Sequence, residues 1–270
     1  MVLFSFYTSL AVSIPFSSRA DCTKALLSSA ADAYVAAQTA GSITALQPLL
    51  SSNFTYEENN KVIPHQQGVL HKPLKLDHRR TNYDLVACAT YTELVSANGP
   101  YVIGTQIRHA PDGTIAKIDS VSTTTNAWLF NATKTLEFIN KESWPPIPAA
   151  KRDARAAIQA AGDAYMDMWS SATAHTLVPW GTPCVRLEGS AYTGSGQAND
   201  SCQPGIPSNH SQAPNSRRRY VIDEEMGSVH ILCVWEHMMN AADGHEFRLE
   251  GGKLRFVHTM TECGGKVCRL

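Results

Sequence analysis

The sequence predicts an α+β fold in which one module of about 120 residues occurs twice. The tripeptide Asp32–Tyr34 recurs as Asp163–Tyr165, an offset of 131, and beyond a longer loop in the second copy the offset becomes 139. Further pairs at these two offsets are Pro48 and Pro179, Glu57 and Glu188, Arg80 and Arg219, Asp84 and Asp223, Gly113 and Gly252, and Asp119 and His258. Constant offsets interrupted by one insertion indicate two tandem copies, which we expect to pack as an internal pseudo-dimer.

Each copy begins with a segment whose apolar residues recur at helical spacing. These segments are Thr23–Gln38 and Ala154–Trp169. Thr23 and Asp153 stand where each helix begins, and we expect them to be N-caps because their side-chain oxygens can accept from free backbone N–H groups. A short apolar piece follows each helix and ends near Pro48 or Pro179.

Strand-like alternation follows in both copies, which predicts a hairpin-rich antiparallel sheet. Asp112–Gly113 and Gly251–Gly252 have the composition of hairpin turns. The faces predicted from alternation are Val86, Cys88, Thr90 and Thr92; Val229, Ile231, Cys233 and Trp235; and Leu254, Phe256, His258 and Met260.

These patterns divide the chain into a leader and two modules. Residues 1–20 combine an apolar stretch with small residues around Ala20, which is typical of a secretory signal peptide. The first module spans 21–143, a Pro-rich linker 144–150, and the second module 151–270, with its inserted loop at Ser190–Asn215.

Sequons and cysteines also favour a secreted protein. Asn-x-Ser/Thr sequons at Asn53, Asn131, Asn199 and Asn209 predict glycosylation. The seven cysteines lack the spacing of a zinc site, so we expect disulfides in an oxidising compartment. Cys184 and Cys202 flank a loop, Cys263 and Cys268 lie near the C-terminus, and Cys22 or Cys88 is expected to pair with another cysteine. Cys233 lies in an apolar run and is expected to stay reduced.

The chain resembles a family of secreted fungal proteins built from two SnoaL-like, or nuclear-transport-factor-2-like, modules. The segments that carry the resemblance are Tyr101–Arg108, Ala127–Thr133, Trp180–Gly189, Arg219–Glu224, His245–Arg255 and Val257–Cys263. The resemblance implies two cone-shaped barrels, each with a curved sheet around a helix and a pocket at its wide end. It assigns no single reaction. It implies an acidic residue at the position of His230, where this chain departs from it.

Candidate site residues follow from the predicted faces. His258 lies among large apolar residues, so we expect it to line the pocket as general acid or base, with Asp223 as its orienting partner. An Asp–His pair of this kind is what the resemblance to SnoaL-like cyclases and dehydratases implies. Arg186, Glu188, Tyr192, His230 and Trp180 are expected to bind the substrate. Asp119, Asp84 and Tyr83 are their counterparts in the first module. A core histidine and a surface Arg186–Glu188 ion pair are the structural alternatives.

Composition and absent motifs exclude several other functions. There are 23 Lys and Arg against 24 Asp and Glu, a net charge of −1, so no clustered basic surface for nucleic acid is expected. No apolar stretch reaches the length of a membrane span. The histidines lack a metal-ligand spacing, and no dinucleotide, P-loop or esterase motif occurs, so neither a metal nor a cofactor is expected.

We therefore predict a secreted lyase, isomerase or cyclase that works by proton transfer without a cofactor. Its substrate would be a small, largely apolar molecule of the secondary-metabolite kind. The alternative is a non-catalytic secreted protein that binds a small molecule, or an effector. We expect a monomer or a homodimer.

Overall fold

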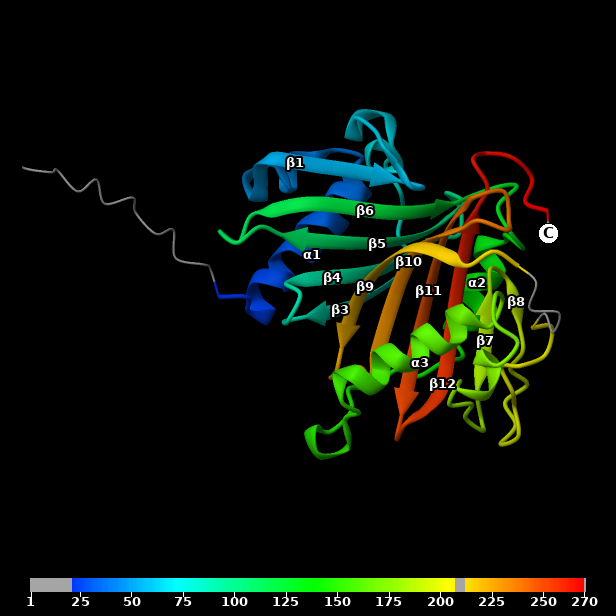
Figure 1. Cartoon of the computed structure of the whole chain (residues 1–270). Helices are drawn as coiled ribbons and strands as arrows, with labels where there is room; N and C mark the ends of the chain where they lie inside the picture. The colour runs from blue at the N-terminus through cyan, green and yellow to red at the C-terminus, as the bar shows by residue number, and fades with distance from the viewer. Residues whose placement is uncertain (1–20, 207–211, 270) are drawn as a thin grey trace, which may run out of the picture.

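The computed structural model describes residues 21–206 and 212–269 and contains two six-stranded sheets, one from each half of the chain (Figure 1). The strand order is β2-β1-β6-β5-β4-β3 in the first sheet and β8-β7-β12-β11-β10-β9 in the second. Adding six to each strand number of the first sheet gives the second. The same topology therefore occurs twice, as the repeated offsets predict. The predicted signal peptide and Asn209 lie outside the described residues.

The first half runs from α1 to α2. Its elements are α1 (Lys24–Ala40), β1 (Leu50–Glu58), β2 (Lys61–Val62), β3 (His78–Asp84), β4 (Ala89–Ser96), β5 (Tyr101–His109), β6 (Ile115–Thr123) and α2 (Ala132–Ile139). β1 pairs with β6 in parallel, whereas β3 to β6 form antiparallel neighbours. The turn at Asp112–Gly113 joins β5 to β6, as predicted.

The second half repeats this plan. Its elements are α3 (Arg155–Asp167), β7 (Val185–Glu188), β8 (Ala191–Tyr192), β9 (Asn215–Asp223), β10 (Ser228–Trp235), β11 (Ala241–Glu250) and β12 (Lys253–Glu262). β7 pairs with β12 in parallel, and the turn at Gly251–Gly252 joins β11 to β12. The described part of the insertion forms the short strand β8 and otherwise loop.

The helix starts differ from the prediction in one half. Thr23 caps α1, because its Oγ1 accepts a hydrogen bond from the Leu26 N–H at 3.1 Å. The predicted cap Asp153 is wrong: Ala154 occupies the cap position of α3 and offers no side-chain acceptor. Instead the first residue of α3, Arg155, is held by an ion pair to Asp84 of the first half at 2.7 Å.

One predicted strand face is also wrong. Val86 and Cys88 lie in the turn between β3 and β4, and Cys88 has a positive φ of 49°. β4 begins only at Ala89. The face predicted on β10 is confirmed, since Val229, Ile231, Cys233 and Trp235 all join the core beneath α3.

In each half, one face of the sheet packs against a helix of the same half, and the opposite face packs against the sheet of the other half. The first core joins α1 to the inner face of the first sheet through residues such as Tyr34, Leu94 and Ile107. The second core joins α3 to the second sheet in the same way, and α3 lies across β9–β12 in Figure 1. A third core, which includes Val121, Leu232 and Met260, lies between the halves. Both sheets are therefore buried on two faces. Among the described residues, no helix is long and apolar enough to cross a membrane.

Candidate functional site

The structure places His258 at the contact between the two sheets, which corrects its predicted place in a pocket. Its Nδ1 lies 2.9 Å from Glu93 Oε1 of β4, and its Nε2 lies 2.7 Å from Glu142 Oε2, in the segment after α2. The residue is 2% exposed, and it is absent from the walls of five cavities in the described part of the chain. His258 therefore joins the two halves through its two carboxylate contacts.

Charge complementarity explains how His258 remains buried. Burial favours the neutral imidazole, but the carboxylates of Glu142 and Glu93 outweigh it and raise the pKa of His258 to about 10. Arg80 of β3 supplies the second cation, since its guanidinium reaches Glu93 Oε2 at 2.9 Å and also pairs with Glu246. This interface cluster, defined as Arg80, Glu93, Glu142, Glu246 and His258, is thus a network of alternating charges.

Part of the interface cluster also meets the distance criterion for a metal site. Ligand atoms of Glu93, Glu246 and His258 lie within 4.8 Å of one another. Arg80, however, already contacts both carboxylates, and each nitrogen of His258 has a carboxylate partner. The positive charge that a metal would bring is already supplied by protein groups, so these residues do not fit a metal ion.

Asp223 is not the partner of His258, which corrects the second predicted catalytic residue. One carboxylate oxygen accepts from the Tyr83 N–H at 2.7 Å across the two halves, and the other accepts from the Glu225 and Met226 N–H groups. Its role is that of a turn carboxylate at the end of β9. The two predicted members of the acid–base pair therefore lie in separate networks.

Other predicted residues also occupy structural positions. His230 is fully buried and stacks on Tyr91 at 3.5 Å, while Gln106 lies 3.0 Å from its Nδ1. Burial lowers the pKa of His230, which keeps it neutral. Asp119, the counterpart of His258, binds Arg219 across the contact at 2.7 Å. Trp180 packs at the edge of the second core and donates its indole N–H to the His175 carbonyl at 3.1 Å.

The predicted substrate-binding residues Arg186, Glu188 and Tyr192 line two different cavities, and Tyr83 lines a third together with Asp223. Arg186 and Glu188 line a cavity of about 70 Å³ between α3 and the second sheet, which we name the aromatic cavity. Tyr192 lines a different cavity, beside the inserted loop. The aromatic side chains of the aromatic cavity are those of Trp128, Tyr165, Trp169 and Trp235. Its lining is completed by Gly205, Ile206, His245 and Thr259.

Hydrogen bonds to protein atoms fix the charged wall of the aromatic cavity. The two terminal nitrogens of Arg186 donate to the carbonyls of Cys202, at 2.8 Å, and Pro204. Its Nε lies 3.2 Å from Glu188, and Glu188 accepts the indole N–H of Trp128 at 2.8 Å. The inserted loop and the first half thereby both anchor this wall.

An Asp–His pair does border the aromatic cavity, but it consists of Asp243 and His245 on β11. His245 Nδ1 lies 2.8 Å from Asp243 Oδ2. Asp243 is held in turn by Thr261 Oγ1 at 2.6 Å and by the Cys233 thiol at 3.3 Å. His245 Nδ1 is itself buried and makes no hydrogen bond of suitable geometry among the described residues, so its contact with Asp243 is a close ion-pair distance. Sequence reasoning missed this pair, although Asp-x-His at strand spacing puts both side chains on one face.

Two further polar atoms mark the cavity walls. Trp169 Nε1 and Thr259 Oγ1 are both buried without a hydrogen-bond partner, and both residues line the cavity. Buried polar atoms are normally satisfied, so a cavity with several such atoms is suited to a polar ligand.

The first half has no such pair at the corresponding place. Thr105 lies opposite Ser120 across β5 and β6, as His245 lies opposite Thr259 across β11 and β12. Thr105 Oγ1 lies within hydrogen-bond distance of both Ser120 and the hydroxyl of Tyr34 on α1. A closed chain of hydroxyl groups therefore replaces the acid–base pair.

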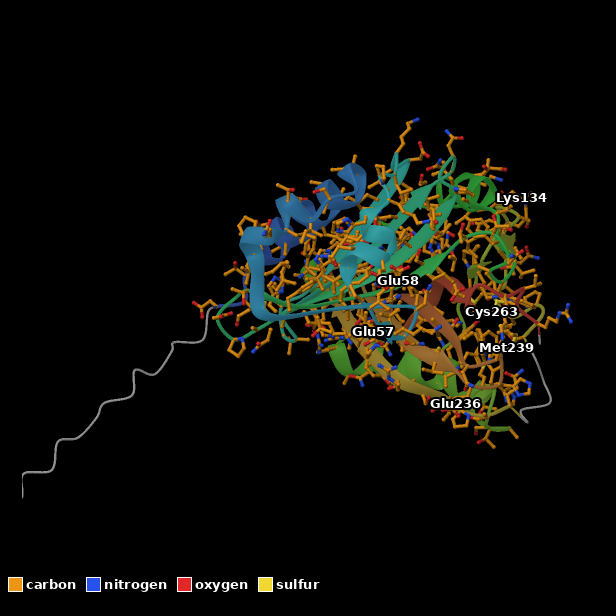
Figure 2. The ribbon with its side chains drawn as sticks, turned by 90° about the horizontal axis from the view of Figure 1, so that it is seen from above. Glu57, Glu58, Lys134, Glu236, Met239 and Cys263 are labelled. Carbon is orange, nitrogen blue, oxygen red and sulfur yellow. A yellow bond between two sulfur atoms is a disulfide. The ribbon has the colours of Figure 1, made fainter. Side chains whose placement is uncertain are left out.

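In the first half, the place that corresponds to the aromatic cavity is also covered by the chain around the short turn Val69–His71. Glu58, labelled in Figure 2, accepts from the Tyr56 hydroxyl at 2.5 Å and from the Val69 N–H at 2.7 Å. Val69 and Leu70 belong to a short 3-10 turn, Val69–His71, and are buried in the first core. An Asp–His pair at this place in the module is therefore present in the second half, as Asp243 and His245, and absent from the described part of the first half.

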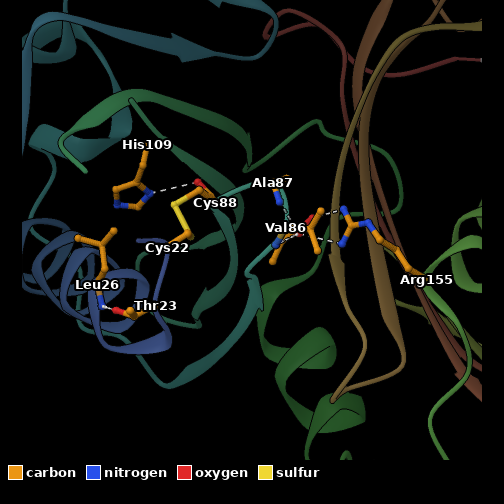
Figure 3. The surroundings of a disulfide bond; sticks show 9 residues. Cys22, Thr23, Leu26, Val86, Ala87, Cys88, His109 and Arg155 are labelled. Atoms are coloured by element: carbon orange, nitrogen blue, oxygen red, sulfur yellow. Dashed lines mark hydrogen bonds and ion pairs between the residues drawn. A yellow bond between two sulfur atoms is a disulfide. The ribbon is translucent and has the colours of Figure 1, made fainter. Parts of the chain in front are cut away.

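Three disulfides link the cysteines as Cys22–Cys88, Cys184–Cys202 and Cys263–Cys268, and Cys233 is free and buried. This confirms the expected local pair and the reduced cysteine. The first bond ties the start of α1 to the turn before β4, beside the backbone of Val86 and Ala87 (Figure 3). The predicted glycosylation residues Asn53, Asn131 and Asn199 are exposed, and Asn131 also caps α2.

Comparisons with known proteins give a family match for the second half and weak similarities for the chain. A family model described as a domain of unknown function, DUF8021, matches residues 151–261. No curated protein matches. A DUF4783 family protein from Bacteroides fragilis YCH46 is 20% identical, with a TM-score of 0.25, over 33% of this chain and 94% of that chain. An NTF2-like protein from Bacteroides fragilis NCTC 9343 is 8% identical, with a TM-score of 0.22, over 92% of this chain and 100% of that chain. The chain is thus similar to DUF8021 proteins over residues 151–261, and its two six-stranded sheets repeat one α+β topology.

Proposed function

We propose that the second half is an acid–base enzyme that moves a proton on a small carbonyl compound, with His245 as the base and Asp243 as its orienting residue. The observation that carries this proposal is the Asp243–His245 pair at the wall of an aromatic cavity. It retains the proton-transfer chemistry expected from the sequence and replaces both predicted catalytic residues.

The proposed roles of Asp243 and His245 follow from their contacts. Asp243 lies 2.8 Å from Nδ1 and would favour a proton on that nitrogen, which would leave the lone pair on Nε2 to take a proton from carbon. His245 then returns this proton to another carbon, which is an isomerisation, or to a departing hydroxyl group, which is a dehydration. Arg186 contributes a fixed positive charge that would stabilise the enolate-like oxygen formed between the two steps.

Tyr165 of α3 is suited to assist as a hydrogen-bond donor. It lines the cavity within hydrogen-bond reach of Arg186. Burial raises its pKa above the ordinary value for tyrosine, so the hydroxyl keeps its proton at neutral pH. A protonated hydroxyl beside a guanidinium is a combination that can bind a carbonyl oxygen.

The size of the cavity limits the substrate. A volume of about 70 Å³ is several times the roughly 10–15 Å³ that a cavity needs to hold one water molecule. Only a small compound, or the reacting end of a larger one, fits without movement of the walls. The aromatic side chains around it favour an unsaturated or otherwise flat reacting group.

The second candidate is a binding protein without turnover. It is favoured by the saturation of the charged wall, since Arg186 and Glu188 already have protein partners. In either case we place the protein in an oxidising compartment, because three disulfides persist most readily there. We also propose that each half is a cone-shaped SnoaL-like barrel and that the residues before Asp21 are a secretory signal peptide.

Exchange of carbon-bound hydrogen for deuterium tests the proposal directly. The protein is incubated in D₂O with a panel of small ketones, enones and β-hydroxy ketones, and proton NMR follows loss of the signal next to the carbonyl. We expect exchange of at least one compound by the intact protein and a loss of about 100-fold or more in the His245→Gln variant. His109→Gln, which alters a histidine of the first half, should exchange at the original rate. If the protein binds compounds of the panel but exchanges hydrogen in none of them, the result would favour a binding protein without turnover.

A further inference from the structure

A second cavity, of about 900 Å³, lies beside the inserted loop of the second half. The segment after α2 and strands β7, β8 and β12 complete its walls. Side chains that matter here are Lys141, Tyr192, Gln197, Asp200, Arg255 and Phe256. We name it the loop cavity. It shares no lining residue with the aromatic cavity.

Arg255 is the one cation of β12 that enters this cavity, and it lacks an acidic partner among the described residues. Its guanidinium lies 4.2 Å from the centre of the Phe256 ring, and its Nη1 is buried without a hydrogen-bond acceptor. A buried guanidinium nitrogen without an acceptor is costly, because it has lost its hydration. Its place beside a large cavity therefore points to an anionic ligand.

The nearby carboxylate of Asp200 is already occupied. It accepts from the N–H groups of Ser195, Gly196 and Gln197 and from the Ser195 hydroxyl. These hydrogen bonds, with the Ser195 hydroxyl first, hold the pKa of Asp200 below its ordinary value. Asp200 therefore orders the loop and does not neutralise Arg255.

A second cation and two aromatic rings complete the recognition surface. The Lys141 ammonium pairs with Glu137 at 2.8 Å and lies 4.8 Å from the centre of the Phe138 ring. The ion pair is an exposed i,i+4 pair that is weak enough to open. The ring of Tyr192 stacks on Phe138 at 4.5 Å, and that of Phe256 stacks on Trp144 at 5.1 Å. Both rings are thus held in place and present flat apolar walls.

We propose that the loop cavity binds an aromatic carboxylate. Arg255 binds the carboxylate in a two-pronged hydrogen bond, Lys141 adds a second positive charge, and the aromatic part of the ligand packs against Tyr192 and Phe256. The volume is within the range of sites for small organic molecules. The site has no counterpart in the first sheet's half, because the loop that walls it is the insertion of the second half, closed by Cys184–Cys202.

Calorimetric titration with 1-naphthoate tests this site. We expect 1-naphthoate to bind and the neutral analogue 1-naphthylmethanol to bind at least about tenfold more weakly. Arg255→Gln should weaken binding of the carboxylate about tenfold, and Arg255→Lys should have a smaller effect because it keeps the charge. Lys253→Gln is the matched control: it removes the same charge from an exposed position on the same strand and should leave the affinity unchanged.

Three outcomes would overturn the proposal: no binding of 1-naphthoate, equal binding of the alcohol, or an unchanged affinity in Arg255→Gln. Circular dichroism of each variant shows that it is folded, and Arg255→Lys provides a second reading if the glutamine variant is not. His245→Gln should bind 1-naphthoate with the original affinity. A loss in that variant would place the ligand in the aromatic cavity and would also overturn the assignment, whatever the outcome of the deuterium exchange.

Discussion

Asp84 and Asp223 make the same contact with each other's half of the molecule. The Asp84 carboxylate accepts from the Ile222 N–H at 2.9 Å, and the Asp223 carboxylate accepts from the Tyr83 N–H at 2.7 Å. Each aspartate also accepts two N–H groups of the turn that follows it. The offset of 139 relates both donors and acceptors, so these two hydrogen bonds mark the pseudo-twofold relationship between the halves.

Removal of either carboxylate should destabilise the protein. We expect Asp223→Ala to lower the free energy of unfolding by about 1–3 kcal/mol, because three part-buried backbone N–H groups lose their acceptor. Asp84→Ala should cost more, since Arg155 also loses its ion-pair partner. Urea unfolding measures both. Asp223→Asn keeps one of the two side-chain acceptors and is the intermediate variant, expected to lose less stability than alanine. Unchanged stability in Asp223→Ala would show that these hydrogen bonds do not stabilise the fold.

Raising the pH should lower the free energy of unfolding, because His258 loses its proton. Its pKa is about 10 in the folded protein and about 6.5 when unfolded. A raised folded pKa stabilises the folded state fully below the unfolded pKa, and this contribution is lost as the pH rises through the folded pKa. The free energy of unfolding should therefore fall between pH 6.5 and 10, by at most about 1.4 kcal/mol per pH unit from this one group.

The variant His258→Gln isolates that contribution. It should be less stable than the original protein at pH 6.5, because Glu93 and Glu142 lose a cation, and the difference should shrink toward pH 10. Thermal unfolding across this range is the measurement. A difference that stays constant with pH would mean that the imidazole is not charged in the folded protein.

The disulfide Cys184–Cys202 should stabilise both the fold and the wall of the aromatic cavity. It closes a loop with a sequence separation of 18 residues, and Arg186 donates to the Cys202 carbonyl. In the chain-entropy model, removing it as Cys184→Ser with Cys202→Ser costs about 3 kcal/mol. Chemical unfolding should show this loss. The disulfide Cys263–Cys268 closes a much shorter loop, so replacing both of its cysteines with serine should cost less stability. A larger loss on removing Cys263–Cys268 than on removing Cys184–Cys202 would contradict the expectation.

Gly244 should tolerate no side chain without a cost in stability. A Cβ there would lie 3.2 Å from His230 Nε2 and 3.4 Å from Leu232 Cδ2, inside the contact between the sheets. We expect Gly244→Ala to lower the free energy of unfolding by about 1–3 kcal/mol. Since Gly244 separates Asp243 from His245, deuterium exchange should decrease as well. An alanine variant with unchanged stability would show that the sheets can separate slightly at this point.

Sequence patterns predict the duplicated topology but not which face of a strand carries function. Alternation correctly groups His258 and Met260 with Phe256, yet that face lies toward the first half, while Val257 and Thr259 face α3. Leu254, predicted on the same face, lies instead in the core with α3, because the register of β12 shifts at Arg255. Both faces of the sheet are buried, so apolar alternation cannot distinguish the helix side from the sheet side. The sequence therefore predicts that His258 is buried but not what buries it.

The Asp243–His245 pair was obscured by its local composition. Asp243-Gly244 is typical of a hairpin turn, and nothing in the sequence shows that the two residues continue a ten-residue strand. Gly244 is there for packing against His230, not for turning the chain. The interface cluster was equally hidden, since its members come from Arg80 to His258 and meet only through the packing of two sheets.

The burial of Cys233 has a consequence for the covalent integrity of the chain. Burial, together with the carboxylate of Asp243, raises the pKa of this thiol well above its ordinary value. The thiolate, not the thiol, attacks disulfides, so the odd cysteine cannot initiate exchange with the three existing bonds while the protein is folded. An unpaired cysteine, which would otherwise scramble a disulfide-bonded protein, is thereby kept in its unreactive thiol form, chiefly by burial and further by the neighbouring Asp243 carboxylate.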